Sequence, residues 1–411
     1  MATLKSISSA DIKTTRTTLN QLVDFVEEDV SGSSTRKKFQ VFVTGTTSDP
    51  GVTSSLFHTV YDQDYTLQTA NEIFDVTVGL FTDSICVSSS STGTDTNGKK
   101  LFSSESMMMR EKINIYRQYA QLLLGDATSQ FAAPYGSSTS TDSINEACFL
   151  NFKRLFVRDG IKRETFAMRF YRSSSAATLQ EDGALGAAGQ SNIDRLTTSG
   201  SAIFTDVGSA TSIERSEAGG DVGNIVNSSN TSETVGLLFY QQGIAILDLA
   251  KALSGSQHMS GSIDAVGNSA GRVVMGHNPG IVYPNQAKFI PDFMISGSID
   301  AITEHISSVR CGSGSTTFLT FQNNTQINST LIFCRATADE FNFSSNPTYK
   351  DSEGRIVVID ETQQGIQKSF AFVTTVGLYD ANEKLLAVAK LSRPVEKNDE
   401  KDLTFRVRLD F

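Results

Sequence analysis

The sequence predicts a β-rich α+β fold, in which antiparallel sheets form a sandwich or a meander and a few amphipathic helices accompany them. Short apolar runs that alternate with polar residues recur along the chain and are most regular in its final quarter. The composition agrees, because 26 Phe and no Trp supply the large apolar side chains while Ser and Thr crowd the connecting segments. With 411 residues, the chain can bury one large core or several ordinary ones.

The first element expected is an N-terminal helix. Ser9 or Asp11 can cap its start, and Gly32 follows its end. Its apolar stripe at helical spacing consists of Ile12, Leu19, Leu22, Val23 and Val26. A helix of this kind has to pack either on the body of its own chain or on a neighbouring subunit.

Two strands and the clearest helix of the chain come next. Residues 37–45 (KKFQVFVTG) and 74–87 (FDVTVGLFTDSICV) have the alternation of strands, and residues 88–100 form a polar loop. The next segment predicts a helix that Ser103 or Ser104 caps and that Gly125 ends. The apolar stripe of this helix consists of Met108, Ile115, Tyr119 and Leu122.

The middle of the chain changes character. Residues 148–171 predict an apolar segment, a turn at Asp159-Gly160 and a strand that alternates Phe166, Met168 and Phe170. From residue 173 to 232 small polar residues dominate, and Phe204 is the one aromatic residue. So few large apolar groups do not offset the entropy of ordering, which predicts a long loop or a flexible insertion.

Order resumes after residue 232. Two apolar runs joined at Gln241-Gln242-Gly243 predict a hairpin. The hexapeptide SGSIDA occurs at residues 260–265 and again at 296–301, and both copies are interpreted as turn or helix-start signals. The second copy leads into the apolar residues Ile302, Ile306 and Val309.

The final quarter predicts an antiparallel meander. Six strand-like runs, separated by Asn, Asp, Gly and Pro, occupy residues 315–322, 327–336, 355–361, 369–379, 384–392 and 403–411. Residues 379–383 supply a turn, and Arg393-Pro394 is expected to break the strand after that turn. In the last run Leu403, Phe405, Val407, Leu409 and Phe411 face one way.

These segments define four expected parts: an N-terminal helical arm (1–36), an α+β domain (37–172), a polar loop or insertion (173–232) and an antiparallel β domain (233–411). The chain has 35 basic and 45 acidic residues and a net charge of −10. This sign disfavours nucleic acid and anionic membrane surfaces as partners. An N-terminus without a secretory apolar core, and the absence of an apolar run of about 18 residues, favour a soluble protein made in a cytoplasm.

One motif could indicate catalysis. GNSAG, residues 267–271, matches the nucleophile elbow of serine hydrolases, with Ser269 followed by Asp292 or Asp300 and by His305. That chemistry needs a strand before the serine and a helix after it, whereas the polar SGSIDAV precedes the motif and Gly276 interrupts any helix after it. We therefore expect a small-residue turn, no catalytic residue and no enzyme activity.

The cysteines, the histidines and one run of methionines are expected to have structural roles. Cys86, Cys148, Cys311 and Cys334 are widely spaced and are expected to be buried free thiols. The four histidines, His58, His258, His277 and His305, are scattered singly and are expected to be hydrogen-bonded structural residues. The run Met107–Met109 is interpreted as core filling. We expect neither a metal site nor a cofactor.

Three further segments could bind a calcium ion, contact a partner or lie exposed to solvent. Residues 95–106 resemble a calcium loop, but Gly98 is fourth and Ser106 is twelfth, so a surface turn is expected. Residues 339–349 (DEFNFSSNPTY) alternate aromatic with polar residues and could contact a partner. Residues 396–402 (EKNDEKD) are a charge run that is expected to be solvated.

Part of the chain resembles a known class of proteins. Residues 321–349 and 372–411, above all LYDANEKLLAVAKLSRP at 378–394, resemble virion structural proteins of T4-like contractile-tailed phages, especially those of marine cyanobacteria. Residues 113–125 and 149–171 are similar to earlier segments of the same proteins. The resemblance covers about half of the chain and leaves out residues 173–232.

The resemblance implies a non-enzymatic structural component of a phage virion, most specifically a tail baseplate subunit. It implies other copies of the chain and other virion proteins as partners, within a symmetric assembly. A neck, collar or capsid accessory protein is one alternative, and a receptor-binding module of a tail fibre is another. We hypothesise that the N-terminal helix around Leu19 to Val26 and the C-terminal strand ending at Phe411 make the subunit contacts.

Overall fold

The chain divides into two compact units, which we describe separately. In the computed structural model, the body comprises Asn20–Thr325, and the terminal unit comprises Met1–Leu19 with Gln326–Phe411. The boundary falls inside two strands, β1 (Ile12–Val26) and β18 (Thr317–Ala336). The structure describes residues 4–26, 36–42, 53–89, 92–94, 100–153, 159–172, 201–253, 261–263, 273–275, 290, 293–307, 311, 317–344, 346–354 and 370–410.

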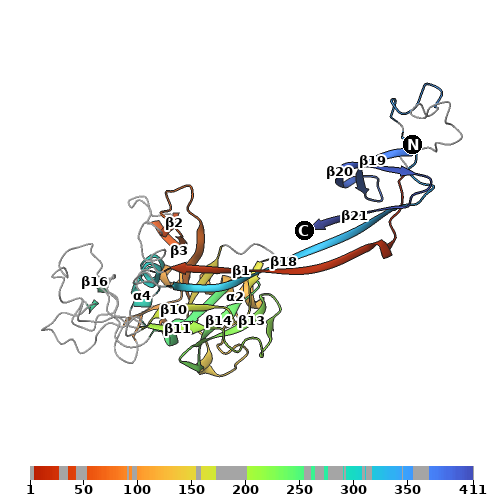
Figure 1. The fold of residues 1–411 in the computed structure, drawn as a ribbon. Coiled ribbons are helices and arrows are strands. Elements are labelled where there is room, and N and C mark those ends of the chain that lie inside the picture. The colour runs from red at the N-terminus through yellow and green to blue at the C-terminus, as the bar shows by residue number, and fades with distance from the viewer. Residues whose placement is uncertain are drawn as a thin grey trace. The chain divides into compact units, whose positions relative to one another are not determined.

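The body is built on one antiparallel sheet (Figure 1). Its strands follow the order β2 (Arg36–Phe42), β3 (Thr53–Tyr61), β4 (Glu72–Leu80), β8 (Glu146–Phe152), β15 (Ile244–Asp248), β14 (Asn230–Phe239), β13 (Gly220–Asn227), β11 (Ser201–Thr205), β10 (Ala167–Tyr171) and β18. The short strands β12 (Glu214–Ser216) and β9 (Asp159–Ile161) pair with β13 and β18. Two sequential meanders, β2 to β4 and β10 to β15, are thus joined through β8.

The centre of this sheet is buried on both faces. Eight of the nine residues of β4 are buried, and all five of β15. Helix α2 (Met107–Leu124) packs on the face of β4 that carries Gly79, where an added Cβ would lie 2.9 Å from the Tyr116 backbone nitrogen. Helix α5 (Ile299–His305) reaches the other face, where His58, paired with Val76, bonds Asp300. Two covered faces explain the almost continuous apolar sequence of β4.

Shorter elements complete the described part of the body. They are the sheet of β5 (Val87–Ser88), β6 (Thr92–Thr94) and β7 (Lys100–Ser103), the pair β16 (Gly261–Ile263) and β17 (Val273–Met275), the helices α3 (Leu249–Ala252) and α4 (Met294–Ser296), and the 3-10 turn η3 (Ser140–Asp142). None of the helices within the described ranges combines the length and the apolar character that spanning a bilayer requires.

The terminal unit consists of strands. It begins with the 3-10 turn η1 (Ser9–Asp11) and the first part of β1, and contains the second part of β18, paired antiparallel with β21 (Leu403–Asp410). Strands β19 (Phe370–Tyr379) and β20 (Leu385–Asn398) form a separate two-stranded sheet. Arg16 donates to Asn328, and Arg335 to Asp11, so side chains of the N-terminal segment bond those of β18.

The predicted fold class is confirmed, since the protein is β-rich, its large sheet is antiparallel and it has few helices. The helix before Gly125 is confirmed with a left-handed Gly125 after it, although Ser106 rather than Ser103 or Ser104 is its N-cap residue. The hairpin at Gln241–Gly243 and the turn at residues 379–383 are also confirmed. The alternation of β21 holds over Leu403–Asp410.

The predicted N-terminal helix is wrong. Residues 12–26 form strand β1, so this described part of the helical arm assigned to residues 1–36 is not a helix. The apolar stripe coincided with a β-branched sequence, Ile12-Lys-Thr-Thr-Arg-Thr-Thr, whose side chains favour extended backbone. Pairing with β18 supplies the backbone hydrogen bonds that a helix would have made internally.

The predicted polar insertion at 173–232 is wrong in its second half. Residues 201–205, 214–216, 220–227 and 230–239 are strands, and Phe204 is fully buried. The expected domain boundaries at residues 36, 172 and 232 do not coincide with the division into two units. The strands between residues 201 and 239 lie in the same sheet as β8 and β15 and therefore belong to the body. Residues 173–200 lie outside the described ranges.

Four further local predictions are corrected. Asp159-Gly160 belongs to strand β9 and is not a turn. Residues 317–322 and 327–336, which were predicted to lie in two strands, belong to one 20-residue strand, β18. Pro394 does not end β20, because residues 391–394 form a bulge between the pairs Val373–Val395 and Thr375–Lys390. The first SGSIDA copy contributes β16, whereas in the second Ser298 caps α5.

The approach of α2 to β4 yields a stability prediction. Gly79→Ala places a methyl group against the Tyr116 backbone nitrogen and 3.0 Å from the Phe149 ring, and neither can retreat in a packed core. We expect the free energy of unfolding to fall by about 1–3 kcal/mol in denaturant titrations. Leu122→Ala on the exposed side of α2 is the control, with an expected change within about 0.5 kcal/mol. Equal losses for both variants would contradict this packing.

Candidate docking surface

The terminal unit differs from the body in how it buries apolar side chains. All members of the hydrophobic core lie between Val60 and Phe321, inside the body. Among the described residues of the terminal unit, the buried apolar ones are Ala336, Tyr349, Ala371, Leu378 and Val407. These five are scattered over its strands and loops. The sheets of the terminal unit therefore lack a contiguous core of their own within the described ranges.

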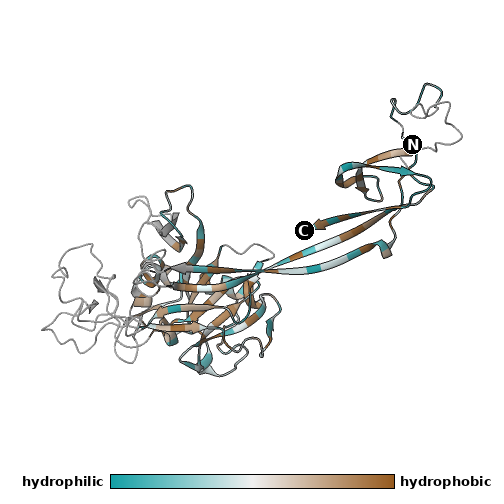
Figure 2. Cartoon of the chain, viewed as in Figure 1, coloured by the Kyte–Doolittle hydropathy of each residue, from teal (hydrophilic) through white to brown (hydrophobic). Residues whose placement is uncertain are grey.

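Large apolar side chains are exposed on the terminal unit instead. They are Leu4, Ile7, Ile12, Leu19, Phe341, Phe343, Phe372, Tyr379, Leu385, Leu386 and Val388. The described part of the much longer body exposes only nine such residues, including Leu22 of β1. Figure 2 shows the apolar residues of the terminal strands in brown among polar neighbours. Clustered exposed apolar residues are typical of surfaces that bind another protein.

The hairpin of β19 and β20 carries the densest group of exposed apolar residues. Three cross-strand pairs share one of its faces: Tyr379 with Leu385, Gly377 with Val388, and Thr375 with Lys390. The Tyr379 ring lies over Gly377, where an added Cβ would be 2.9 Å from Tyr379 Cε2. A side chain at position 377 would displace that ring. Glycine thus lets Tyr379 lie along the strand.

We call Tyr379, Leu385, Leu386 and Val388 the hairpin patch. Their side chains are 47%, 54%, 68% and 52% exposed. Asp380 holds the adjoining turn, because its carboxylate accepts hydrogen bonds from the backbone nitrogens of Asn382 and Lys384, both at 2.8 Å. The patch is therefore presented on a structured turn.

The other end of the hairpin is tied to the loop at residues 337–349. Lys397 is fully buried, and its Nζ donates to the Ala338 carbonyl, to Asn342 Oδ1 and to the Asn398 carbonyl. Tyr349 donates to the Phe370 carbonyl. The charge run at 396–402, expected to be solvated, thus contributes one buried lysine that fastens the sheet to this loop.

The loop at 339–349 exposes two aromatic residues, as its sequence suggested. Phe341 and Phe343 are 40% and 51% exposed, and the Phe343 ring packs edge-on against Tyr349 at 5.5 Å. They add to the exposed apolar surface of the terminal unit. Whether this loop contacts a partner stays a prediction.

The two units differ in net charge as clearly as they differ in the burial of apolar side chains. The terminal unit contains 14 Lys and Arg and 14 Asp and Glu, so its net charge is zero. The whole net charge of −10 therefore belongs to the body. Copies of the body repel each other, whereas copies of the terminal unit do not.

The hydrolase residues behave as structural ones where the structure describes them. Asp300 Oδ1 lies 2.6 Å from His58 Nε2, a contact between α5 and β3, and His58 is fully buried. The His305 ring packs edge-on against Phe293 with 5.7 Å between ring centres. Ser269 and Asp292 lie outside the described ranges, as do His258 and His277, so the turn expected at Ser269 stays a prediction.

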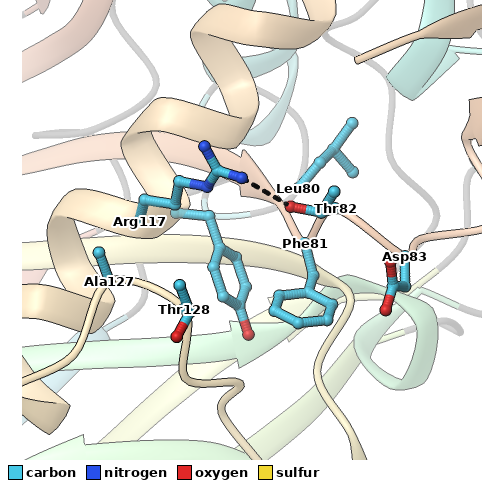
Figure 3. Close-up of a pocket in the computed structure, with 8 residues that line it drawn as sticks. Leu80, Phe81, Thr82, Asp83, Arg117, Ala127 and Thr128 are labelled. Carbon is cyan, nitrogen blue, oxygen red and sulfur yellow. Dashed lines mark hydrogen bonds between the residues drawn. The ribbon is translucent and has the colours of Figure 1, made fainter.

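A small hollow lies beside the C-terminal half of α2 (Figure 3). Its volume is about 80 Å³, and it is lined by Leu80, Phe81, Thr82, Asp83, Tyr116, Arg117, Ala127 and Thr128. Arg117 donates to Thr82 Oγ1 across its mouth at 3.4 Å. Sites for metabolites are typically about 300–1,000 Å³, so this hollow accommodates water and not a substrate.

Thiols and metal ligands give no further site in the described ranges. Cys86, Cys148 and Cys311 are buried, as predicted, whereas Cys334 is partly exposed. Burial raises the pKa of the Cys148 thiol to about 12, which keeps it protonated and unreactive. No group of three His, Cys, Asp or Glu side chains in these ranges could hold a metal ion. Met109 is fully buried, as core filling requires, but Met107 is exposed.

Sequence reasoning missed the buried ionisable side chains of the body, of which Lys112 and Asp248 are two. Lys112 is fully buried, and its Nζ donates to the Met294 and Gly297 carbonyls, which fastens α2 to α4. Desolvation lowers the pKa of Lys112 to about 8. Asp248 is buried at the start of α3, where it accepts from the Ala250 nitrogen at 3.0 Å. Only the apolar spacing around each position could have signalled its burial.

The charge of Asp248 also affects a second buried carboxylate, Glu146. Desolvation raises the pKa of Asp248 to about 6, while Lys251 and the backbone bonds oppose the shift. Desolvation also raises the pKa of Glu146, and the charge of Asp248 raises it further. Both groups lie among apolar side chains and therefore hold their protons at higher pH than in the unfolded chain.

Comparison with protein-family models, with curated proteins and with solved structures finds no match to this chain.

The raised pKa of Asp248 predicts a pH dependence of stability. Its folded pKa exceeds the unfolded value of 3.8, so the folded state binds more protons between about pH 4 and pH 6, and stability falls as the pH rises through this window. Asp248→Asn keeps the cap on Ala250 and removes the titration. Relative to this variant, the wild-type chain should lose roughly 2 kcal/mol of unfolding free energy between pH 4 and pH 6. Denaturant titrations at pH 4, 5 and 6 measure it, and parallel curves for the two proteins would contradict it.

Proposed function

We propose that this chain is a non-enzymatic structural subunit of a phage virion, and specifically a tail baseplate protein of a contractile-tailed phage. In this role the body is a folded support, and the terminal unit docks onto other virion proteins and onto other copies of the chain. The single observation that carries the proposal is the terminal unit, whose described strands lack a contiguous core and expose apolar side chains.

The physical argument starts from the stability of small sheets. A two-stranded sheet such as β19–β20 is marginal in water unless a third strand, a helix or another surface covers it. Phe372, Tyr379 and Leu385 each keep about half of their surface in water. Burying them against a partner removes that apolar area from water at about 25 cal/mol per Å², which favours association. A subunit of an assembly gains this stabilisation on docking.

The resemblance to virion proteins supports the same assignment. Its most specific stretch, residues 378–394, is the turn end of the β19–β20 hairpin, including the hairpin patch. The stretch that resembles tail proteins is thus mostly exposed or partly exposed, with Leu378 buried.

The experiment that tests the proposal uses purified particles of the phage that encodes the chain. We expect the protein in the particles by mass spectrometry, and we expect a label on it to mark the baseplate in electron micrographs. A label at the neck, the capsid or the fibres would contradict the baseplate assignment. A protein found only in the infected-cell lysate would contradict the virion assignment altogether.

A variant isolates the role of the terminal unit. Replacing Phe372, Tyr379 and Leu385 by Ser changes exposed positions, so the thermal midpoint should stay within a few degrees of wild type. Incorporation into particles should fall at least about tenfold, because the docking surface loses its apolar groups. The matched control replaces Leu122, Val207 and Ile213, which the body exposes. Equal incorporation of both variants would contradict docking through the terminal unit.

A further inference from the structure

We infer that the hairpin patch binds the hairpin patch of a second copy of this chain, face to face and antiparallel about a two-fold axis. The inference rests on the proposed function and deepens it, because it assigns one surface to contact between copies. Three observations carry it: the exposed apolar face, the charges at its two ends, and the neutrality of the terminal unit.

The first observation is the shape and chemistry of the face. Tyr379, Leu385 and Val388 lie on one side of the antiparallel pair, whose register shifts between Leu378 and Tyr379, and Gly377 leaves the space that the Tyr379 ring fills. The face is therefore low in relief and apolar. Two flat sheet faces pack by interdigitating side chains at about 10 Å, the same arrangement that fills a β-sandwich.

The second observation is the charge at each end of the hairpin patch. Lys390 lies on the same face, opposite Thr375, two residues beyond Val388. The turn at the other end carries Asp380 and Glu383, which precede Leu385. Lys384 is also in this turn, and together with Asp380 and Glu383 it leaves the turn end with a net charge of −1.

These charges fix the orientation of the second copy. An antiparallel pair places Lys390 of each chain near Glu383 of the other, which creates two identical attractive contacts. A parallel pair would place lysine against lysine and glutamate against glutamate. Like charges across an interface are costly, so the antiparallel arrangement is selected. The contact is self-complementary, as a two-fold interface requires.

The third observation is the charge of the units. A foreign partner could be selected by net charge, but the terminal unit has none, with 14 basic and 14 acidic residues. Neutral units approach one another without long-range repulsion. The four side chains of the hairpin patch form a small contact compared with the 20–30 residues of a standard interface, so one contact is weak and repetition in an assembly strengthens it.

The test is a charge exchange in the full-length chain. Lys390→Glu leaves two glutamates facing at each contact, and Glu383→Lys leaves two lysines. Each variant alone should associate at least about tenfold more weakly than wild type in sedimentation equilibrium. An equimolar mixture of the two should recover association, because a heterodimer of the variants has one attractive pair at each end.

Matched controls are Arg406→Glu and Asp402→Lys, which make the same charge changes at exposed positions on and beside β21. Neither control, nor their mixture, should alter association. Wild-type chain that stays monomeric up to roughly 1 mM would overturn the inference, as would a mixture of the Lys390 and Glu383 variants that associates no better than either alone. Incorporation of the wild-type chain into particles in spite of that result would leave the proposed function standing, with another surface as its contact.

Discussion

Burial of apolar side chains is distributed unevenly along this chain, and the rest of the structure depends on that fact. The body covers both faces of its central strands, with α2 on one side of β4 and α5 on the other. The terminal unit also consists of strands paired by antiparallel hydrogen bonds. Its described strands, however, have no layer packed over them that would form a hydrophobic core. A sheet satisfies its backbone hydrogen bonds internally and still leaves its faces to be covered from outside.

The body tolerates several buried polar groups, and these show how firmly its parts are joined. Lys112 reaches backbone carbonyls at α4, and the Tyr116 hydroxyl donates to the Ile144 carbonyl while accepting from the Phe131 nitrogen. Asp206 accepts from the backbone nitrogens of Glu164 and Phe166 and from the Tyr240 hydroxyl. Each group loses hydration on folding and regains hydrogen bonds, which is the condition under which buried polar side chains are retained.

Much of the fold could be predicted from the sequence because its strands alternate. The hairpin at residues 233–249, the helix before Gly125 and the alternation of β21 could be inferred from periodicity and turn chemistry alone. The N-terminal strand could not, since Leu19, Leu22 and Val23 fit a helical stripe as well as an exposed strand. Only its long-range pairing with β18 decides between them. The prediction for residues 201–232 was wrong for a related reason. Small side chains are sufficient in a strand when the neighbouring strands supply the large apolar side chains.

The candidate docking surface was only partly foreseeable. Sequence reasoning placed subunit contacts at the two termini, but it could not tell which strand positions stay exposed, because exposure depends on what packs above each face. Gly377 is an example. Its spacing from Tyr379 is visible in the sequence, yet the fit of the ring over the glycine depends on the paired register. Lys397 is another example, since the sequence of a charge run does not indicate which of its side chains is buried.

The most direct test of the central claim compares side-chain accessibility in the free chain and in the assembled particle. Hydroxyl-radical footprinting reads Tyr379, Phe372 and Leu385 individually against Leu122 and Val207 of the body, all of which are exposed in the single chain. If the terminal unit is completed by docking, the first three residues become protected on assembly while the body residues are labelled as before. Full labelling of the hairpin residues in the particle would contradict the account.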